Sequence, residues 1–594
     1  MTNIPYFTLR DGLSSSLTLN NLSQSAMPVT ITTYNTEGRS QALDTITLDP
    51  HSFKQIELRD VVTSDLFDSG SLQVSYRGGP MQVTCQVSVY SLDKRVSFES
   101  REQDMMDFES ANLNGIVSLP QKDAQGFLAL TNVSKNQVTA NVTVGSKAKE
   151  IKLFSRETHV LRLNEEFGVK APTSALVKLT QNGLPGDIIT TGFVIDSDDG
   201  YSSAFTMSDP KIMRSSHLAG AHLRFGQPDP NEGFPAGTTF LSPLLLGNVT
   251  DKPVTVHISV DYRVKEKLDM TPVDPKKGDT QDKFSTVNVR DVTVAPGDVQ
   301  RIELANELAK LGVQSPVKEA GVDIDYQAPP GSVIGQLVSV DQTGDYSFEV
   351  PIKDPAAMNE MIEGLYPWTL ENGAKTVLHL KNASDKKTTA LVAFNFPAGT
   401  YIPPPIDLEP YQTVAIDIQA LKESGEKDLR GQIFLAGATH GQVEWHQETP
   451  RTMIGRAEET NLSKGIATSF SCGASCCRYP LDTYNWYDNV CLSYDGHSCL
   501  ASLTGDIGAS VSLTAVESGY LCNGGNFGPL SPPRYASLAG WTSGNYGVAD
   551  TSPGWPYVNL VGAGTTNVTA TYNVIDGYAI IAAPSSAPRR HPLK

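Results

Sequence analysis

Several features that mark common classes of protein are missing from this 594-residue chain. No run of about 18 apolar residues occurs, so no segment is predicted to span a membrane as a helix. Lysine and arginine number 47 against 65 aspartate and glutamate residues, a net charge of -18, and the cations form no cluster. Because phosphate binding depends on grouped cations, nucleic acid and anionic membrane surfaces are excluded as expected partners.

The motifs of common catalytic sites are absent as well. The chain has no G-x-S-x-G, no phosphate-binding loop, no dinucleotide fingerprint and no H-E-x-x-H. Carboxylates such as Glu57, Asp323 and Asp325 occupy the polar positions of alternating segments, which predicts that they face solvent. Acid-base chemistry needs a base and its partner together in a cleft. We therefore predict a protein that is not an enzyme and needs no cofactor.

The beginning of the chain has no secretion signal. Residues 1–11 contain neither a basic region nor an apolar one, and residues 6–12 already have the pattern of a strand and a turn. We interpret the chain as a mature protein or a fragment whose export signal, if it had one, lies outside this sequence.

One short segment is present four times, with the consensus L-x-L-x-N-x-[S/T]. Its asparagines lie at intervals of 111, 116 and 134 residues, which is the size of a whole domain. In each copy an alternating strand leads into the asparagine and a hydroxyl residue, and a second strand follows, a pattern typical of a β-turn. We expect the asparagine side chain to cap the turn by hydrogen bonds to backbone N–H groups. The four residues are Asn21, Asn132, Asn248 and Asn382.

Each repeat continues through further short strands, roughly seven per 110 residues, with regular turns. This predicts an all-β chain of tandem antiparallel Ig-like β-sandwich modules; placed end to end, five modules would reach on the order of 150 Å. The expected divisions are repeats at 1–104, 105–212, 213–356 and 357–455, a Cys-rich segment at 456–505, a last Ig-like module at 506–583 and a disordered tail at 584–594.

The third repeat is the longest because it carries two insertions, residues 226–237 and 265–284. Loops on a rigid framework often bind partners, although a surface insertion can also be without function. The same repeat contains the most helical segment of the chain, residues 304–312, where Gly312 is predicted to cap the helix.

Six of the seven cysteines lie close together after the fourth repeat. An even number within a short segment favours a disulfide framework in an oxidising compartment, with 15 possible pairings. The alternative is a zinc site, but the regular C-x-x-C pairs of structural zinc sites are missing. The six residues are Cys472, Cys476, Cys477, Cys491, Cys499 and Cys522.

The end of the chain resembles the group 2 bacterial immunoglobulin-like domain. The resemblance rests on W-x-S-x-N at Trp541–Asn545, the following Val548-Ala549, and G-x-G-T-x-x-V-T-A-T at residues 562–571. It covers about 65 residues and implies an Ig-like sandwich of the kind found in bacterial surface proteins, adhesins and some phage proteins.

Two sets of side chains have a composition suited to metal ions. Asp196, Asp198 and Asp199 crowd a turn as in the start of a calcium loop, but the position also matches a plain hairpin turn of the other repeats. His440, Glu444 and His446 would share one face of a strand, although a rise of about 3.3 Å per residue spreads them too widely for one metal.

Together these patterns predict a secreted or cell-surface bacterial protein with a structural or adhesive role, as a stalk, adhesin or assembly subunit. Its expected partners are other proteins, surface glycans or further copies of itself. The alternatives are a carbohydrate- or peptide-binding accessory region of a larger exported enzyme, or a phage or virion surface protein.

Overall fold

The computed structural model describes most of residues 2–470, apart from short breaks and a longer one at 268–279, and beyond 470 the backbone of strands between residues 483 and 587. Antiparallel sheets dominate and helices are few, so the all-β prediction is confirmed. The longest helices of the described residues, α3 (Leu304–Lys310) and α4 (Ile418–Ser424), have seven residues each. No helix in this part of the chain could cross a membrane.

The first two modules each consist of two antiparallel sheets around one hydrophobic core. In the first, the sheet orders are β1-β7-β3-β4, with β5 beside β3, and β6-β2-β8-β9; in the second they are β10-β15-β12-β13 and β14-β11-β16-β17. The bounds are β1 Thr2–Thr8, β2 Ser14–Asn21, β3 Met27–Asn35, β4 Ser40–Ala42, β5 Ile46–Leu48, β6 Phe53–Glu57, α1 Leu58–Val61, β7 Ser69–Tyr76, β8 Val83–Ser91, β9 Val96–Arg101, β10 Asn112–Leu119, β11 Gln125–Asn132, β12 Val138–Val144, β13 Lys147–Leu153, β14 Thr158–Arg162, α2 Leu163–Phe167, β15 Thr173–Gln181, β16 Ile188–Asp196 and β17 Tyr201–Phe205.

The third and fourth modules repeat this plan. Their sheet orders are β18-β24-β21-β22 and β19-β25-β20-β23, with β26 beside β25, then β27-β33-β29-β30, with β31 beside β29, and β32-β28-β34-β35. The bounds are β18 His217–Gly220, β19 Phe240–Leu241, β20 Pro243–Asn248, β21 Val254–Lys267, β22 Thr280–Val294, β23 Val299–Glu303, β24 Glu319–Tyr326, β25 Val333–Asp341, β26 Ser347–Pro351, β27 Glu363–Thr369, β28 Lys375–Asn382, β29 Thr388–Phe396, β30 Gly399–Tyr401, β31 Ile406–Leu408, β32 Thr413–Asp417, β33 His440–Gln447, β34 Met453–Asn461 and β35 Ile466–Phe470.

Strands differ in how their polar faces are covered. Strand β3 alternates between buried and more exposed residues, as expected of a sheet with one face in solvent. In contrast, β20 is buried at every residue and β33 at all but its first. The outward faces of these strands are covered by a neighbouring module: Leu245 of β20 packs with Ile116 and Leu176 of the second module, and Gln442 of β33 donates to the carbonyl of Asn21 in the first.

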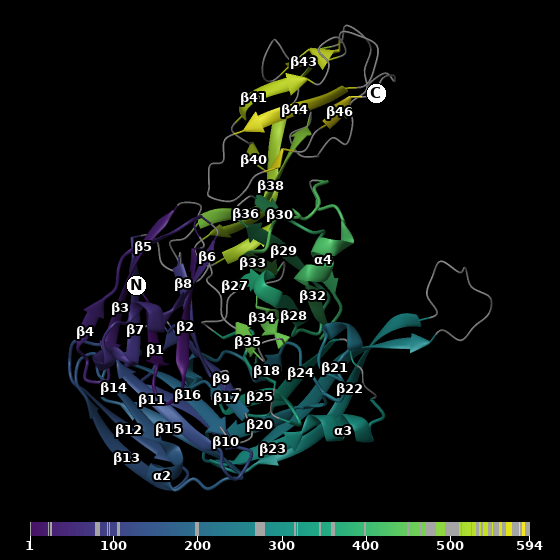
Figure 1. Ribbon diagram of the computed structural model, residues 1–594. Helices are drawn as coiled ribbons and strands as arrows, with labels where there is room; N and C mark the ends of the chain where they lie inside the picture. The colour runs from purple at the N-terminus through teal and green to yellow at the C-terminus, as the bar shows by residue number, and fades with distance from the viewer. Residues whose placement is uncertain are drawn as a thin grey trace.

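The four modules surround a common centre. The last strands β9, β17, β26 and β35 lie next to one another in a closed circle, each beside the next and β35 beside β9. Figure 1 shows β9, β17 and β35 together near the middle of the body, with the purple, blue, teal and green modules around them. The modules therefore do not follow one another end to end, as the estimate of 150 Å supposed.

This arrangement follows from where the chain enters and leaves each module. A residue two or three places after the last strand forms a β-bridge to the first strand of the same module, in the pairs Asn3 with Gln103, Asn114 with Ser208 and Ala219 with Lys353. The two ends of a module thus lie side by side, instead of at opposite ends as in a rod. Successive modules must then turn around the junction.

Two aspartates close these junctions in the same way. The carboxylate of Asp209 accepts hydrogen bonds from the backbone N–H groups of Glu109 (2.8 Å) and Ser110 (2.7 Å), which precede the first strand of the second module. Asp354 accepts from the N–H groups of Arg214 (2.7 Å) and Ser215 (2.8 Å), which precede the first strand of the third. Each aspartate therefore ties the exit of its module to the entrance.

One expected boundary is wrong. Strand β34 (Met453–Asn461) runs across residue 455 and pairs with β28, and β35 pairs with β34. The fourth module therefore extends to residue 470, because these strands complete its second sheet. The change in composition near residue 451 lies inside the module.

The insertions and the C-terminal region are placed as follows. In the first insertion, Phe234 packs edge-on against Phe240 and Tyr346 of its own module. The second extends the hairpin of β21 and β22, and its tip lies outside the described residues.

Beyond 470, β41 (Leu538–Ser543), which carries the W-x-S segment, pairs with β44 (Thr566–Tyr572), which carries V-T-A-T. Figure 1 shows these strands projecting from the body.

Candidate functional site

The four repeated asparagines have nearly identical surroundings. Each is fully buried, and its Oδ1 accepts from the N–H and the hydroxyl of the residue two places on, as in Asn132 with Ser134 at 2.9 and 2.8 Å. Its Nδ2 donates to carbonyls across the module; Asn132 reaches Leu153 O at 3.1 Å and Phe154 O at 3.0 Å. The same bonds recur at Asn21, Asn248 and Asn382.

These bonds do more than cap a turn. The Nδ2 bonds join the strand that ends at the asparagine to the end of a later strand of the module, for example β11 to the end of β13 and the residue after it. In the folded state the amide nitrogen is buried and bonded, so it offers no site for a glycan although each asparagine lies in an N-x-[S/T] sequence.

The proposed metal ligands lie apart from one another or outside the described residues. His440 bonds to Glu371 at 2.7 Å, while Glu444 accepts from Asn395 at 3.0 Å and His446 is buried. Asp196 is buried at the end of β16, and residues 198 and 199 lie outside the described part. Of the clustered cysteines, Cys491 and Cys522 lie on strands whose side chains are not described, and the other four lie outside the described residues: Cys472, Cys476, Cys477 and Cys499.

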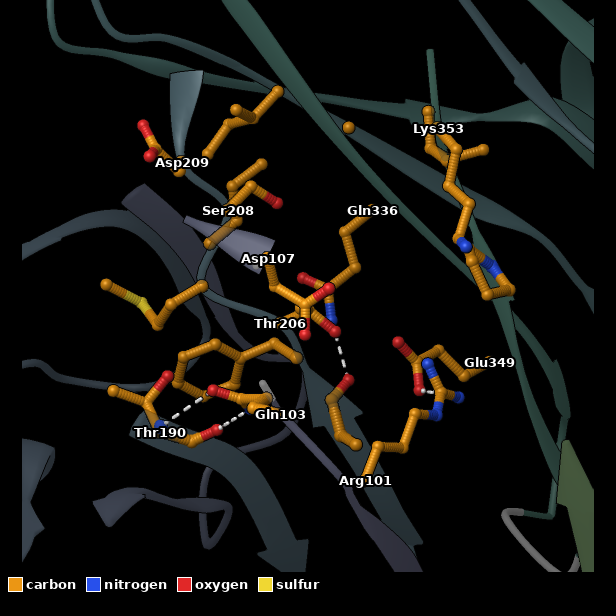
Figure 2. A pocket seen from close by; sticks show the side chains of 18 of the residues that line it. Arg101, Gln103, Asp107, Thr190, Thr206, Ser208, Asp209, Gln336, Glu349 and Lys353 are labelled. Atoms are coloured by element: carbon orange, nitrogen blue, oxygen red, sulfur yellow. Dashed lines mark hydrogen bonds and ion pairs between the residues drawn. The ribbon is translucent and has the colours of Figure 1, made fainter. Parts of the chain in front are cut away.

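A cavity of about 190 Å³ lies where the first three modules meet. Figure 2 shows Arg101 and Gln103 of the first module facing Gln336 and Glu349 of the third. Arg101 pairs with Glu349 at 3.0 Å, and Gln336 donates to the carbonyl of Ala204 at 3.1 Å. Residues of three modules line the cavity, and no single module contains it.

The side-chain amide of Gln103 fixes one wall of the cavity, because it bonds the backbone of Thr190 as a neighbouring strand would. Its amide nitrogen donates to the carbonyl of Thr190 at 2.6 Å, and its amide oxygen accepts from the N–H of Thr190 at 3.1 Å (Figure 2). Both backbone groups of Thr190 are thereby satisfied by a side chain of another module, which sets the distance between the first two modules.

Two glutamates of the first module make this region acidic. Burial raises the pKa of Glu99 to about 7, although Ser88 Oγ and Gln86 Nε2 donate to one of its oxygens at 2.9 and 2.6 Å. Burial likewise raises the pKa of Glu102 to about 7 against the bond from the N–H of Cys85 at 3.0 Å. Neither carboxylate has a cation in direct contact among the ion pairs of the described residues.

The interface between the third and fourth modules contains buried charges. Lys381 is fully buried and pairs with Asp261 and with Asp323, the latter at 2.8 Å. Burial disfavours the ammonium, but the two carboxylates outweigh it and hold the pKa of Lys381 above its usual range. Asp323 therefore does not face solvent as its alternating strand predicts, because the fourth module covers that face.

A second buried cluster lies in the same interface. Glu458 pairs with Arg224 and, at 2.8 Å, with Arg456, beside the stacked rings of His222 and His379, whose centroids are 4.1 Å apart. Burial lowers the pKa of both histidines well below 6.5, and the neighbouring arginines add to this.

This cluster has the composition of a metal site but not its geometry. Ligand atoms of His222, His379 and Glu458 lie within 4.8 Å of one another, the one such group of three in the described part of the chain. The rings are parallel to within 3°, whereas a metal lies in the plane of each imidazole that binds it. Two guanidinium groups also face the carboxylate. The cluster is better suited to join two modules than to hold a cation.

The cavity and both clusters were missed in the sequence because each is assembled from several modules. One signal was available: Lys381 occupies the position before the repeated asparagine, where the other copies have Asn20, Thr131 and Gly247. The charge at this position distinguishes the fourth repeat, whose outer face contacts Asp261 and Asp323 of the third module.

No protein-family model matches the chain, and no curated protein matches its sequence.

Proposed function

We propose that this chain is a secreted or cell-surface attachment protein without catalytic activity, in which Ig-like modules serve as a framework. The observation that carries the proposal is the way the modules are joined. Buried polar contacts such as Lys381 with Asp261 and Gln103 with Thr190 link neighbouring modules into one body. Such a body is suited to holding the C-terminal region in a fixed position toward a partner.

The compartment is supported by two features of the sequence. The six clustered cysteines favour an oxidising environment. The resemblance of residues 509–572 to a bacterial Ig-like domain implies a surface or phage protein. In this proposal the four-module body is the base, and the C-terminal region makes contact with a protein or glycan.

A second role, carbohydrate binding, is favoured by a groove of about 590 Å³ between the first two modules. Its floor includes Tyr6 and Phe127, which both stack on Phe193, and its rim includes Gln125 and Arg162. Aromatic faces beside planar polar groups are suited to sugar rings.

The two roles are separated by binding of the intact chain to glycan and surface-protein arrays. If the C-terminal region makes the contact, a chain that ends at residue 470 should lose binding and Phe127→Ala should leave it intact; the groove predicts the reverse. Turnover of glycoside, ester or peptide substrates by the purified chain would contradict the proposal, as would a failure to bind any partner on either array.

A further inference from the structure

The cavity between the first three modules has a strongly one-sided charge. Six carboxylates and two cations line it, a formal net charge of -4. Asp209 and Asp354 are occupied by backbone N–H groups, and Glu349 by Arg101, as described above. The charged residues are Glu99, Glu102, Asp107, Asp209, Glu349 and Asp354, with Arg101 and Lys353.

Three side chains of the lining carry oxygen atoms that have no hydrogen-bonding partner in the described protein. They are Oε1 of Glu99, Oε1 of Gln336 and Oγ1 of Thr190, and each side chain belongs to a residue more than nine-tenths buried. An unsatisfied buried acceptor costs about 1–3 kcal/mol, so three around one cavity call for a molecule that donates hydrogen bonds. Oε1 of Gln336 is an acceptor only, and Oε1 of Glu99 is one when its carboxyl is ionised.

The remainder of the lining is apolar. Phe108, Phe205, Met207, Ile334 and Ile352 contribute carbon surface and no strong ligand atoms. A calcium or magnesium ion takes six or more oxygen ligands and would find none on this side. The volume of about 190 Å³ admits a small organic molecule.

From the charge, the unsatisfied acceptors and the apolar wall, we infer that the cavity binds a small organic cation, a primary ammonium group on a short apolar chain. The ammonium lies among the carboxylates with Glu99 as its anionic partner, and its chain lies against Phe205 and Ile352. This binding is independent of the attachment role proposed above, because it requires neither the C-terminal region nor the groove.

The raised pKa values of the two glutamates agree with this occupant. A cation stabilises the ionised form of Glu99 and Glu102, so binding releases protons near neutral pH. The affinity should therefore increase as the pH rises from 6 to 8.

The test uses the full chain and three probes of equal size: butylammonium, butan-1-ol and butyrate. Calorimetry at constant ionic strength should show one site for butylammonium, with a dissociation constant in the millimolar range or below, and at least tenfold weaker binding of the other two. Glu99→Gln keeps the acceptor for Ser88 and Gln86 but removes the charge, and should weaken butylammonium at least tenfold. Glu165→Gln removes an exposed carboxylate of α2 and is the matched control.

Glu102→Gln provides a second variant should Glu99→Gln fail to fold, which the melting curve of each protein will show. Equal binding of the three probes, no binding of butylammonium at tens of millimolar, or unchanged affinity in whichever glutamate variants fold would each overturn the inference. If calcium binds the same site more tightly than butylammonium does, the inference of an organic cation is wrong.

Discussion

The substitution Asn132→Ala tests how the repeated asparagine stabilises a module. It removes the acceptor of the Ser134 N–H bond and the donor to Leu153 O and Phe154 O. Each buried group left without a partner costs about 1–3 kcal/mol, and some of these groups lie partly at the surface. We expect a total loss of about 2–4 kcal/mol in the free energy of unfolding.

The shift in melting temperature depends on what unfolds together. The entropy of unfolding is about 2.1 cal/mol/K per residue, so a module of about 100 residues would shift by roughly 10–20 °C. A body of about 470 residues that melts as one unit would shift by only about 2–4 °C for the same loss. Differential scanning calorimetry thus measures both the strength of the turn and the coupling between modules.

The matched control is Asn141→Ala on β12. Asn141 also lies in an N-x-[S/T] sequence, but its side chain is exposed. The Asn141→Ala protein should melt within about 2.5 °C of the natural protein if modules melt singly, and within about 0.5 °C if they melt as one unit, because exposed substitutions typically change stability by less than 0.5 kcal/mol. If Asn132→Ala melts at the same temperature as Asn141→Ala, the buried hydrogen bonds do not stabilise the module.

Three further predictions concern the interfaces and the cysteines. Lys381→Ala should loosen the contact between the third and fourth modules by about 3–5 kcal/mol, since it leaves two carboxylates buried without their cation; limited proteolysis that detects no new cleavage between these modules would contradict this. His222 and His379 stay neutral in the fold but take up protons in the unfolded chain, so stability should fall as the pH drops below 6.5, by at most about 1.4 kcal/mol per pH unit for each histidine. The raised pKa values of Glu99 and Glu102 have the opposite effect, because they favour the folded state as the pH falls. The free energy of unfolding is therefore measured against pH for the natural protein and for His379→Gln. The variant should lose about half of the decrease in stability that the two histidines cause. If the six clustered cysteines form three disulfides, mass spectrometry of the unreduced, unfolded chain should find a single alkylatable thiol, that of Cys85. Seven alkylatable thiols would show that the clustered cysteines form no disulfides.

The parts of the fold that the sequence predicts are those encoded locally. Alternation in segments such as β3 gives the strands, and the asparagine with its hydroxyl neighbour gives the turn, because both depend on residues a few positions apart. Gly312, expected to cap a helix, has φ +82° just after α3. The second set of asparagine bonds, from Nδ2 to carbonyls some 20 residues or more away, is a tertiary contact and has no local signature.

The polar faces of the strands show where local reasoning stops. Asp323 and Asp325 share one face of β24, yet Asp323 is fully buried against Lys381 while the side chain of Asp325 is more than half exposed. Nothing within the strand distinguishes them. The difference arises because the fourth module covers one part of that face, and the position of the fourth module depends on the junctions.

The junctions thus determine both the shape of the protein and its sites. In each of the first three modules the chain leaves beside the strand on which it entered, and Asp209 and Asp354 fix this geometry with hydrogen bonds to the preceding linker. With both ends at one corner, tandem modules must gather around that corner, so their outer faces meet and bury charge. The same convergence brings Glu99, Thr190 and Gln336, which are far apart in the sequence, to the lining of one cavity. A chain with the same strands but with module ends at opposite poles would extend as a rod and would form neither the buried ion pairs nor the cavity.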